Sequence, residues 1–191
     1  MKKKTIGAST FLYPMPVVLI GANVEGKPNY EAVAYCGIVQ HKPPLIAFGS
    51  GSKHYTNQGI IENASFSVNI PSDKMVAAVD CCGLVTGKKV DKGAMFANFY
   101  GKLKTAPMIE DCPLNLECKV VHVLRLDPSE DIFIGEIVEV YADPAVLTGG
   151  MPDVKKINPI VFSMHDNNYW KVGERLGAAW SIGKDYINSK E

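Results

Sequence analysis

The sequence feature that most constrains the fold is a pair of long β-rich runs in the second half of the chain. Residues 114–126 and 132–141 are rich in Val, Ile and Leu, and the turn sequence Asp127-Pro-Ser-Glu-Asp131 joins them. Two such runs in direct succession predict an antiparallel pair of strands. A parallel pair needs a crossover of a dozen or more residues, which this turn does not provide.

The rest of the chain supplies more strands than helices. Further strands are expected over residues 16–22, 45–50, 65–70 and 159–163. The first of these ends at the turn Glu25-Gly-Lys-Pro28, so a hairpin partner is expected to follow it. The strand over residues 65–70 alternates with period two and is predicted to be half-buried. Strands in direct succession favour a mainly β protein with flanking helices, folded as a closed or nearly closed antiparallel barrel.

Two short helices are expected beside this barrel. One covers residues 57–63 with Thr56 as its N-cap, since Thr side chains accept hydrogen bonds from the first helical turn. The other follows Pro71-Ser-Asp73 and runs to Cys81. Residues 83–93 are expected to form a polar loop.

Composition sets the class of protein. A length of 191 residues favours one domain, residues 1–191. Lys plus Arg and Asp plus Glu each number 20, so no charge excess favours nucleic acid or an anionic membrane as a partner. The sequence contains no run of 18 apolar residues, so no membrane-spanning helix is predicted. Five cysteines, an odd number in a chain this long, argue against a secreted disulfide framework and favour the cytoplasm.

The sequence Gly49-Ser-Gly-Ser-Lys-His54 predicts an anion-binding loop. It begins like a dinucleotide fingerprint, but His54 stands where the third glycine should be, and the parallel sheet is missing. A Gly/Ser loop between a strand and a helix start still presents free backbone N–H groups to an anion. The alternative is an ordinary polar connection.

A second loop, Gly83-Leu-Val-Thr-Gly-Lys-Lys89, is no P-loop either. Only three residues separate its glycines, and Lys89 stands where Ser or Thr should hold magnesium. Lys88, Lys89 and Lys92 are candidates for contact with the same anion from this second side, and the alternative is a solvated basic turn.

The sequence contains no motif for a metal site or for a catalytic nucleophile. The adjacent pair Cys81-Cys82 lacks the two-residue spacing of thioredoxin-type motifs and has no second pair for zinc. The four histidines form no HExxH motif, and no Gly-x-Ser-x-Gly sequence occurs. No metal site and no catalytic side chain are therefore predicted.

Taken in order, these segments resemble the flavin reductase-like, FMN-binding split-barrel family, in particular its flavoredoxin-like branch. The resemblance extends from about residue 10 to about residue 185 and rests on the order of the segments. They are residues 14–21, 25–29, 32–36, 42–46, 53–56, 61–71, 87–92, 113–117, 134–138 and 169–174. It implies a six-stranded Greek-key barrel, a homodimer, and FMN held non-covalently near the dimer interface.

The resemblance also implies which residues bind FMN. Those along the isoalloxazine ring are Ala32, Ala34, Tyr35, Cys36 and Gly37. Those at the ribityl chain and phosphate are Ser50, Ser52, Lys53, His54 and Thr56. Those closing the site from the second loop are Cys82, Gly83, Lys88 and Lys89. Many family members have Arg at the place of Lys53, and the second loop usually contains Arg, so the bidentate guanidinium contact is missing here.

The implied function is that of an FMN-dependent oxidoreductase that passes electrons from NAD(P)H to flavin or another acceptor. The flavin supplies the redox chemistry, so positioning residues are expected in place of a protein acid or base. The alternatives are an electron carrier between proteins, with a partner such as ferredoxin, a flavin-binding barrel without turnover, and an interaction protein without flavin. The apolar tail from Tyr169 to Trp180 is expected to place Trp170 and Trp180 near the second copy.

Overall fold

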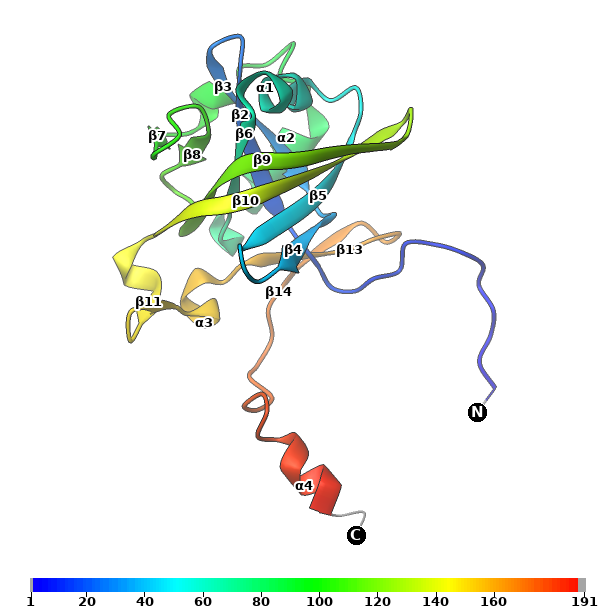
Figure 1. The fold of residues 1–191 in the computed structure, drawn as a ribbon. Coiled ribbons are helices and arrows are strands. Elements are labelled where there is room, and N and C mark those ends of the chain that lie inside the picture. The colour runs from blue at the N-terminus through cyan, green and yellow to red at the C-terminus, as the bar shows by residue number, and fades with distance from the viewer. Residues whose placement is uncertain (1, 189–191) are drawn as a thin grey trace.

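The computed structural model describes residues 2–188 and has a seven-stranded antiparallel sheet as its main element (Figure 1). The strands lie in the order β3-β2-β6-β9-β10-β5-β4. Their bounds are β2 (Val18–Val24), β3 (Lys27–Val33), β4 (Cys36–Gln40), β5 (Leu45–Gly51), β6 (Ser65–Ile70), β9 (Leu114–Asp127) and β10 (Glu130–Ala142). The mainly β class is confirmed, although the sheet has seven strands where six were predicted.

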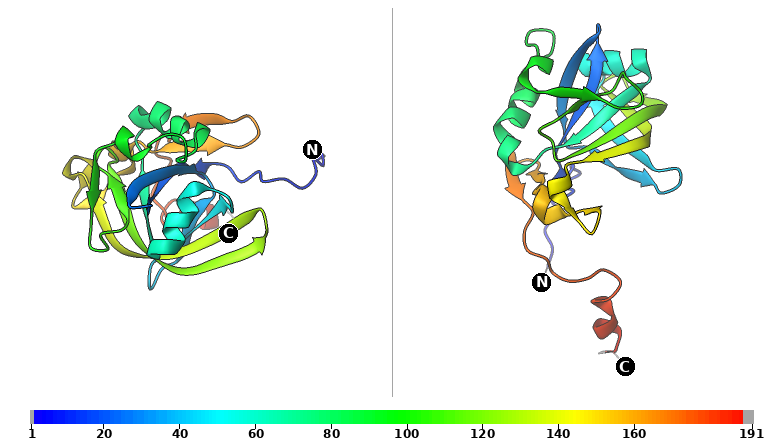
Figure 2. Two further views of the ribbon diagram at one scale, coloured as in Figure 1. Left: turned by 90° about the horizontal axis from the view of Figure 1, so that it is seen from above. Right: turned by 90° about the vertical axis from the view of Figure 1, so that its left-hand side faces the viewer.

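The sheet curls into a barrel whose two edge strands are β3 and β4 (Figure 2). Within the described residues no backbone pairing joins these two edges. Only Ala34 and Tyr35 separate them in the chain, and Tyr35 O accepts a hydrogen bond of 2.9 Å from Gly49 N on β5. We call the open line between β3 on one side and β4 with β5 on the other the seam.

Two hairpins confirm the turn predictions. β9 and β10 pair from Asp127 opposite Glu130 to Leu114 opposite Ala142, with three register shifts. β2 and β3 pair through a two-residue turn, in which Glu25 and Gly26 have φ angles of 51° and 76°. Two positive φ angles in succession are typical of the tight turn that matches strand twist.

Helices and short strands complete the fold, and all but α4, which lies in the C-terminal arm, are near the barrel. The helices are α1 (Tyr55–Asn63), η1 (Asp73–Met75), α2 (Val76–Leu84), η2 (Gly93–Met95), η3 (Pro144–Val146), α3 (Val154–Ile157) and α4 (Gly183–Asn188). The remaining strands are β1 (Met15–Pro16), β7 (Asn98–Tyr100), β8 (Pro107–Ile109), β11 (Leu147–Thr148), β12 (Met151–Pro152), β13 (Ile160–Ser163) and β14 (Asn168–Lys171). Because α2 extends to Leu84, Gly83 is helical rather than part of the predicted loop.

The prediction that Thr56 caps α1 is wrong. His54 is the N-cap residue, and no side chain caps the first turn among the described residues. Thr56 is the second residue after the N-cap and lies within the first turn of α1. Its Oγ1 accepts a 2.8 Å hydrogen bond from Asn29 Nδ2 of β3. The Thr56 side chain therefore bonds to β3 and does not cap α1.

Apolar side chains fill the barrel and a second layer outside it. Phe48 stacks on Phe133 inside the barrel, with ring centroids 5.1 Å apart, and Phe66 meets Phe48 edge-on at the same distance. The prediction that residues 65–70 are half-buried is wrong, because the segment around β8 covers the polar face of β6 as well. Asn69 Oδ1, for example, accepts hydrogen bonds from the backbone N–H of Ile109 and from Asn115 Nδ2.

Both ends of the chain extend away from the barrel (Figure 1). The C-terminal arm, residues 172–188, carries Leu176 and Trp180 with 93% and 96% of their surfaces exposed. On the N-terminal side Leu12 is 76% exposed. No helix within residues 2–188 is long and apolar enough to span a membrane.

Candidate functional site

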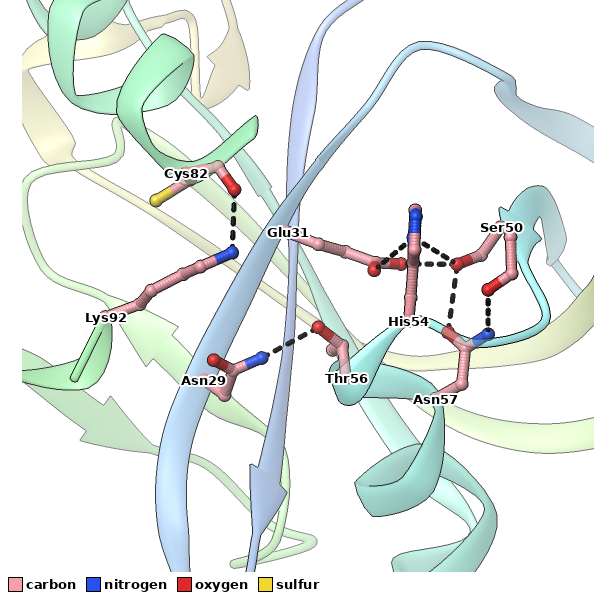
Figure 3. A network of polar contacts seen from close by, with 9 residues as sticks. Asn29, Glu31, Ser50, His54, Thr56, Asn57, Cys82 and Lys92 are labelled. Atoms are coloured by element: carbon pink, nitrogen blue, oxygen red, sulfur yellow. Dashed lines mark hydrogen bonds and ion pairs between the residues drawn. The ribbon is translucent and has the colours of Figure 1, made fainter. Parts of the chain in front are cut away.

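A pocket of about 270 Å³ lies against the seam, between β3, the connection from β5 to α1, and the segment from Cys82 to Lys92. We call it the polar pocket (Figure 3). The side chains that carry its polar character are Asn29, Glu31, Lys53, His54, Thr56 and Lys92. They come from three parts of the chain that only the folded barrel brings together.

His54 is held at the mouth of this pocket by a buried carboxylate. Its Nδ1 lies 3.0 Å from Glu31 Oε2, and Ser50 Oγ lies 2.9 Å from Glu31 Oε1. The hydrogen bond to Glu31 raises the pKa of His54 above its ordinary value of 6.5, although burial and the nearby charge of Lys92 oppose this. These side-chain contacts bridge β3 and β5 where backbone pairing is missing.

Lys92 provides a buried ammonium group at the far wall. The residue is only 4% exposed, and its Nζ donates a 2.7 Å hydrogen bond to Cys82 O. Burial lowers the pKa of Lys92, since desolvation disfavours the charged form. An anion in the pocket would supply the countercharge that stabilises this ammonium.

The second loop reaches the pocket because it has a glycine at its closest approach. A Cβ atom added at Gly87 would overlap Asn29 Oδ1 and lie 2.7 Å from a ring carbon of Tyr55. Asn29 cannot move away cheaply, because it is 4% exposed and bonded to Thr56. Gly87 thus allows the loop to pack directly on β3 and α1.

Lys88 and Lys89 lie next to the polar pocket in an adjoining hollow of about 230 Å³. The two cavities share Asn29, Tyr55, Gly87 and Lys92 as walls. Lys88 Nζ lies 5.9 Å from the centre of the Tyr55 ring. Both lysines therefore add positive charge near the pocket without lining it.

An apolar groove of about 710 Å³ takes its walls from the residues that follow β3. Its walls include Ala34, Tyr35, Cys36, Gly37 and Ile38, together with residues of the N-terminal segment and of β5 and β10. Ala32 lines the polar pocket, so the two cavities take walls from neighbouring positions of the same stretch of chain. The pair of cavities suits a ligand with an anionic end and a flat apolar end.

The cysteines at these cavities are poor nucleophiles. Burial raises the pKa of Cys36 to about 12 and that of Cys82 to about 11. A thiol with such a pKa stays protonated at neutral pH, and the thiolate is the reactive form. Within the described residues, no group of three metal-ligating side chains occurs.

Comparison with known proteins decides the family. A sequence model of the Flavin reductase like domain matches residues 10–162. The chain belongs to the flavin reductase-like family. The crystal structure of flavoredoxin from Methanosarcina acetivorans superimposes with a TM-score of 0.94 at 49% identity, covering 97% of this chain and 100% of that one.

Two further structures agree with this membership. Flavoredoxin of Desulfovibrio vulgaris (Miyazaki F) has a TM-score of 0.89 at 35% identity and covers 96% of this chain and 100% of its own. An FMN-binding protein from Thermus thermophilus shares the fold at a TM-score of 0.79 and 21% identity, over 92% and 99% of the two chains. The split-barrel fold class that the sequence implied is thereby confirmed.

The residues that the flavin reductase-like resemblance singled out fall into distinct places. Those lining the polar pocket are Ala32, Lys53, His54, Thr56, Cys82 and Gly83. Those lining the apolar groove are Ala34, Tyr35, Cys36 and Gly37. Ser50 lies beneath the pocket, and Ser52 donates a 2.6 Å hydrogen bond to Pro128 O in the turn between β9 and β10. Ser52 therefore does not line the polar pocket but a neighbouring hollow of about 440 Å³, which it shares with Lys53 and His54.

Asn29 and Glu31 were not predicted from the sequence, whereas Lys92, a predicted candidate for contact with the anion, lines the polar pocket. Asn29 and Glu31 are both on β3 and are two residues apart, so they lie on the same face of the strand. A polar residue at every second position, Lys27, Asn29 and Glu31, was the available signal. Their partners Thr56 and His54 follow more than 20 residues later, and this distance hid the cluster.

Proposed function

We propose that the protein binds FMN non-covalently, with the phosphate in the polar pocket and the isoalloxazine ring along the apolar groove. The observation that carries this proposal is that one stretch of chain contributes to both cavities, with Ala32 in the polar pocket and residues 34–37 in the apolar groove. The donor set fits a phosphate: the pocket combines Lys53, His54 and Lys92 with the uncapped first turn of α1. The flavoredoxin neighbours support the same ligand class.

Bound FMN would supply the redox chemistry, since flavins accept a hydride or single electrons. The residues of this chain would bind and orient it. Lys92, Lys53 and His54 would hold the phosphate by charge. The backbone of residues 34–37 would support the ring, and the partly buried Cys36 would stay protonated beside it. No side chain is required to act as acid or base.

A titration with FMN and riboflavin tests this proposal. Riboflavin lacks the phosphate, and a hydrogen bond to a charged group contributes about 1.5–3 kcal/mol. FMN is therefore expected to bind at least about tenfold more tightly than riboflavin. Equal affinities would show that the polar pocket does not hold the phosphate, and no flavin binding at all would overturn the proposal.

We propose that the protein acts as an oxidoreductase with NAD(P)H as electron donor to flavin or another acceptor. Anaerobic mixing of the FMN-loaded protein with NADH and with NADPH tests the donor. Rapid bleaching of the flavin absorption by either nucleotide supports the reductase.

The second candidate is a carrier of electrons between proteins, and the similarity to two flavoredoxins favours it. Reduction by a reduced ferredoxin, with none by either nucleotide, would establish the carrier. In both cases the bound flavin is expected to be reducible by dithionite.

We further propose a homodimer of one-domain chains. The edge strand β4 exposes Ile38 and Val39, and the C-terminal arm exposes Leu176 and Trp180. A stable protein gains by burying such apolar surface against a partner. A monomer in light scattering at micromolar concentration, with flavin bound, would contradict the dimer.

We propose a cytoplasmic location, since the five cysteines are all free and suit a reducing compartment.

A further inference from the structure

The cluster of Glu31, Ser50, His54 and Asn57 beneath the polar pocket contains more hydrogen-bond acceptors than protons (Figure 3). Ser50 Oγ lies 2.9 Å from Glu31 Oε1 and also 2.9 Å from Asn57 Oδ1. A serine hydroxyl has one proton and can donate to only one of these two oxygens.

The orientation of the Asn57 amide is fixed, which makes this shortage real. Its Nδ2 donates a 3.0 Å hydrogen bond to Gly51 O, so Oδ1 must face Ser50. His54 Nδ1 lies 3.0 Å from Glu31 Oε2 and 3.2 Å from Ser50 Oγ, and its proton serves Glu31. The neutral His54 ring already carries this Nδ1 proton, so a further proton is added at Nε2, and the buried Glu31 carboxylate at Nδ1 stabilises the resulting positive charge.

The cluster is shielded from water except at one point. Glu31, Ser50 and Asn57 are 6%, 5% and 2% exposed, whereas the His54 side chain is 57% exposed. His54 thus connects a buried carboxylate with the polar pocket. A buried carboxylate without a countercharge is costly, so Glu31 favours the protonated imidazole.

The other charged groups around His54 act in the opposite direction. Lys92, on the segment after α2, opposes protonation of His54, and Lys53 lines the same pocket beside it. The Cys82 thiol of α2 stays neutral, since burial raises its pKa to about 11. The balance still leaves the pKa of His54 above its ordinary value of 6.5, because the hydrogen bond to Glu31 outweighs the opposing causes.

We infer that Glu31, Ser50 and His54 form a proton-coupled clamp for the phosphate, in which anion binding is accompanied by uptake of one proton by the His54 imidazole. This inference rests on the proposed FMN site and adds its regulation by pH. Glu31 and Ser50 act as positioning residues: they hold Nδ1, and the imidazolium that results provides the charge facing the anion.

The sign of the pH dependence follows from linkage. An anion stabilises the protonated imidazole, so binding raises the pKa of His54 further and takes up a proton. Affinity for a phosphate-bearing flavin is then highest when His54 is already protonated and falls as the pH rises through its titration. The steepest slope for one proton is about tenfold per pH unit.

The experiment measures FMN and riboflavin affinity by quenching of flavin fluorescence from pH 6.5 to 8.5. The second ionisation of the FMN phosphate has a pKa of about 6, so the ligand is mainly a dianion over this range. FMN affinity is expected to fall several-fold or more across it, while riboflavin affinity stays level. Calorimetry in two buffers of different ionisation enthalpy measures the proton uptake directly.

Three variants separate the roles. His54→Gln should remove the slope and the proton uptake. Glu31→Gln should weaken FMN binding at pH 7 and shift the slope to lower pH, because His54 loses the partner that favours its charge. Glu62→Gln removes an exposed carboxylate of α1 and should match the wild type.

The outcomes distinguish this inference from the proposed function. FMN binding with the same slope and the same proton uptake in the wild type and in His54→Gln would overturn the clamp and leave the FMN site intact. Absence of FMN binding, or equal affinity for FMN and riboflavin, would overturn the phosphate site and the clamp with it. Circular dichroism of each variant shows whether it folds. If Glu31→Gln does not fold, His54→Gln still decides the question, because the His54 side chain is exposed.

Discussion

Along the seam, the polar side chains of the polar pocket are held by hydrogen bonds, whereas several apolar side chains of the groove face solvent. Asn29, Glu31 and Thr56 are nearly fully buried: Asn29 donates a hydrogen bond to Thr56, and Glu31 accepts one from Ser50. In the groove, Tyr35 and Ile38 are 41% and 64% exposed. One copy of the chain thus completes the pocket but leaves the groove open. We expect the pocket to set specificity and the groove to depend on a second copy.

Removal of the buried ammonium should have the largest effect on the pocket. Lys92→Met is expected to weaken FMN binding roughly tenfold to a hundredfold, since a hydrogen bond to a charged group contributes about 1.5–3 kcal/mol. Riboflavin binding should stay close to that of the wild type. Lys89→Met, in the adjoining hollow, is the matched control and should cost less. Equal losses for both lysines would show that net charge, not position, governs the pocket.

A substitution that forces the loop around Gly87 away from β3 and α1 should have the next largest effect on FMN affinity. In Gly87→Val the new side chain overlaps Asn29 and Tyr55, and overpacking of this kind costs about 1–3 kcal/mol. FMN affinity should fall roughly five- to a hundredfold by fluorescence titration. The control is Gly173→Ala, where an added Cβ meets no atom within 4 Å. An unchanged affinity in Gly87→Val would mean that this loop does not close the pocket.

A charge on the exposed edge strand β4, beside the apolar groove, should weaken dimerisation without changing the polar pocket. Ile38→Lys places an ammonium on β4, and dimerisation is expected to weaken at least about tenfold, because an unpaired charge is costly to bury. Sedimentation at several protein concentrations measures this change. Val154→Lys, half-exposed on α3, is the control. Should the dimer persist in Ile38→Lys, the edge of the sheet is not the contact surface.

The smallest effect is expected at Ser52, which the family resemblance assigned to the ligand. Its hydroxyl bonds Pro128 O, so Ser52→Ala should change FMN affinity by no more than about twofold. The free energy of unfolding should fall by about 0.5–1.5 kcal/mol, the contribution of one neutral hydrogen bond. A tenfold loss of FMN affinity would return Ser52 to the binding site.

The elements with local signals were predictable from the sequence. The β9–β10 pair follows from two β-rich runs and a short turn, and the β2–β3 hairpin follows from Glu25-Gly26. Long-range burial was not predictable. The covering of β6 by β8 depends on hydrogen bonds such as that from Ile109 N to Asn69 Oδ1, which join residues 40 positions apart.

The candidate site divides in the same way. Its two anion-binding loops had local signals in glycine, serine and lysine. The buried groups Asn29 and Glu31 gave only a weak signal, because a strand can bury a polar side chain only when a distant partner meets it. For Asn29 and Glu31 these partners are Thr56 and His54, across the seam.

The position of the two tryptophans has a spectroscopic consequence. The chain has two, Trp170 and Trp180, and they are 55% and 96% exposed outside the barrel. Intrinsic tryptophan emission therefore reports on the C-terminal segment and not on the barrel core, whose rings are Phe48, Phe66 and Phe133. A shift of this emission to shorter wavelength with rising protein concentration would record the docking of the arm, while unfolding of the barrel would need a far-ultraviolet or flavin signal.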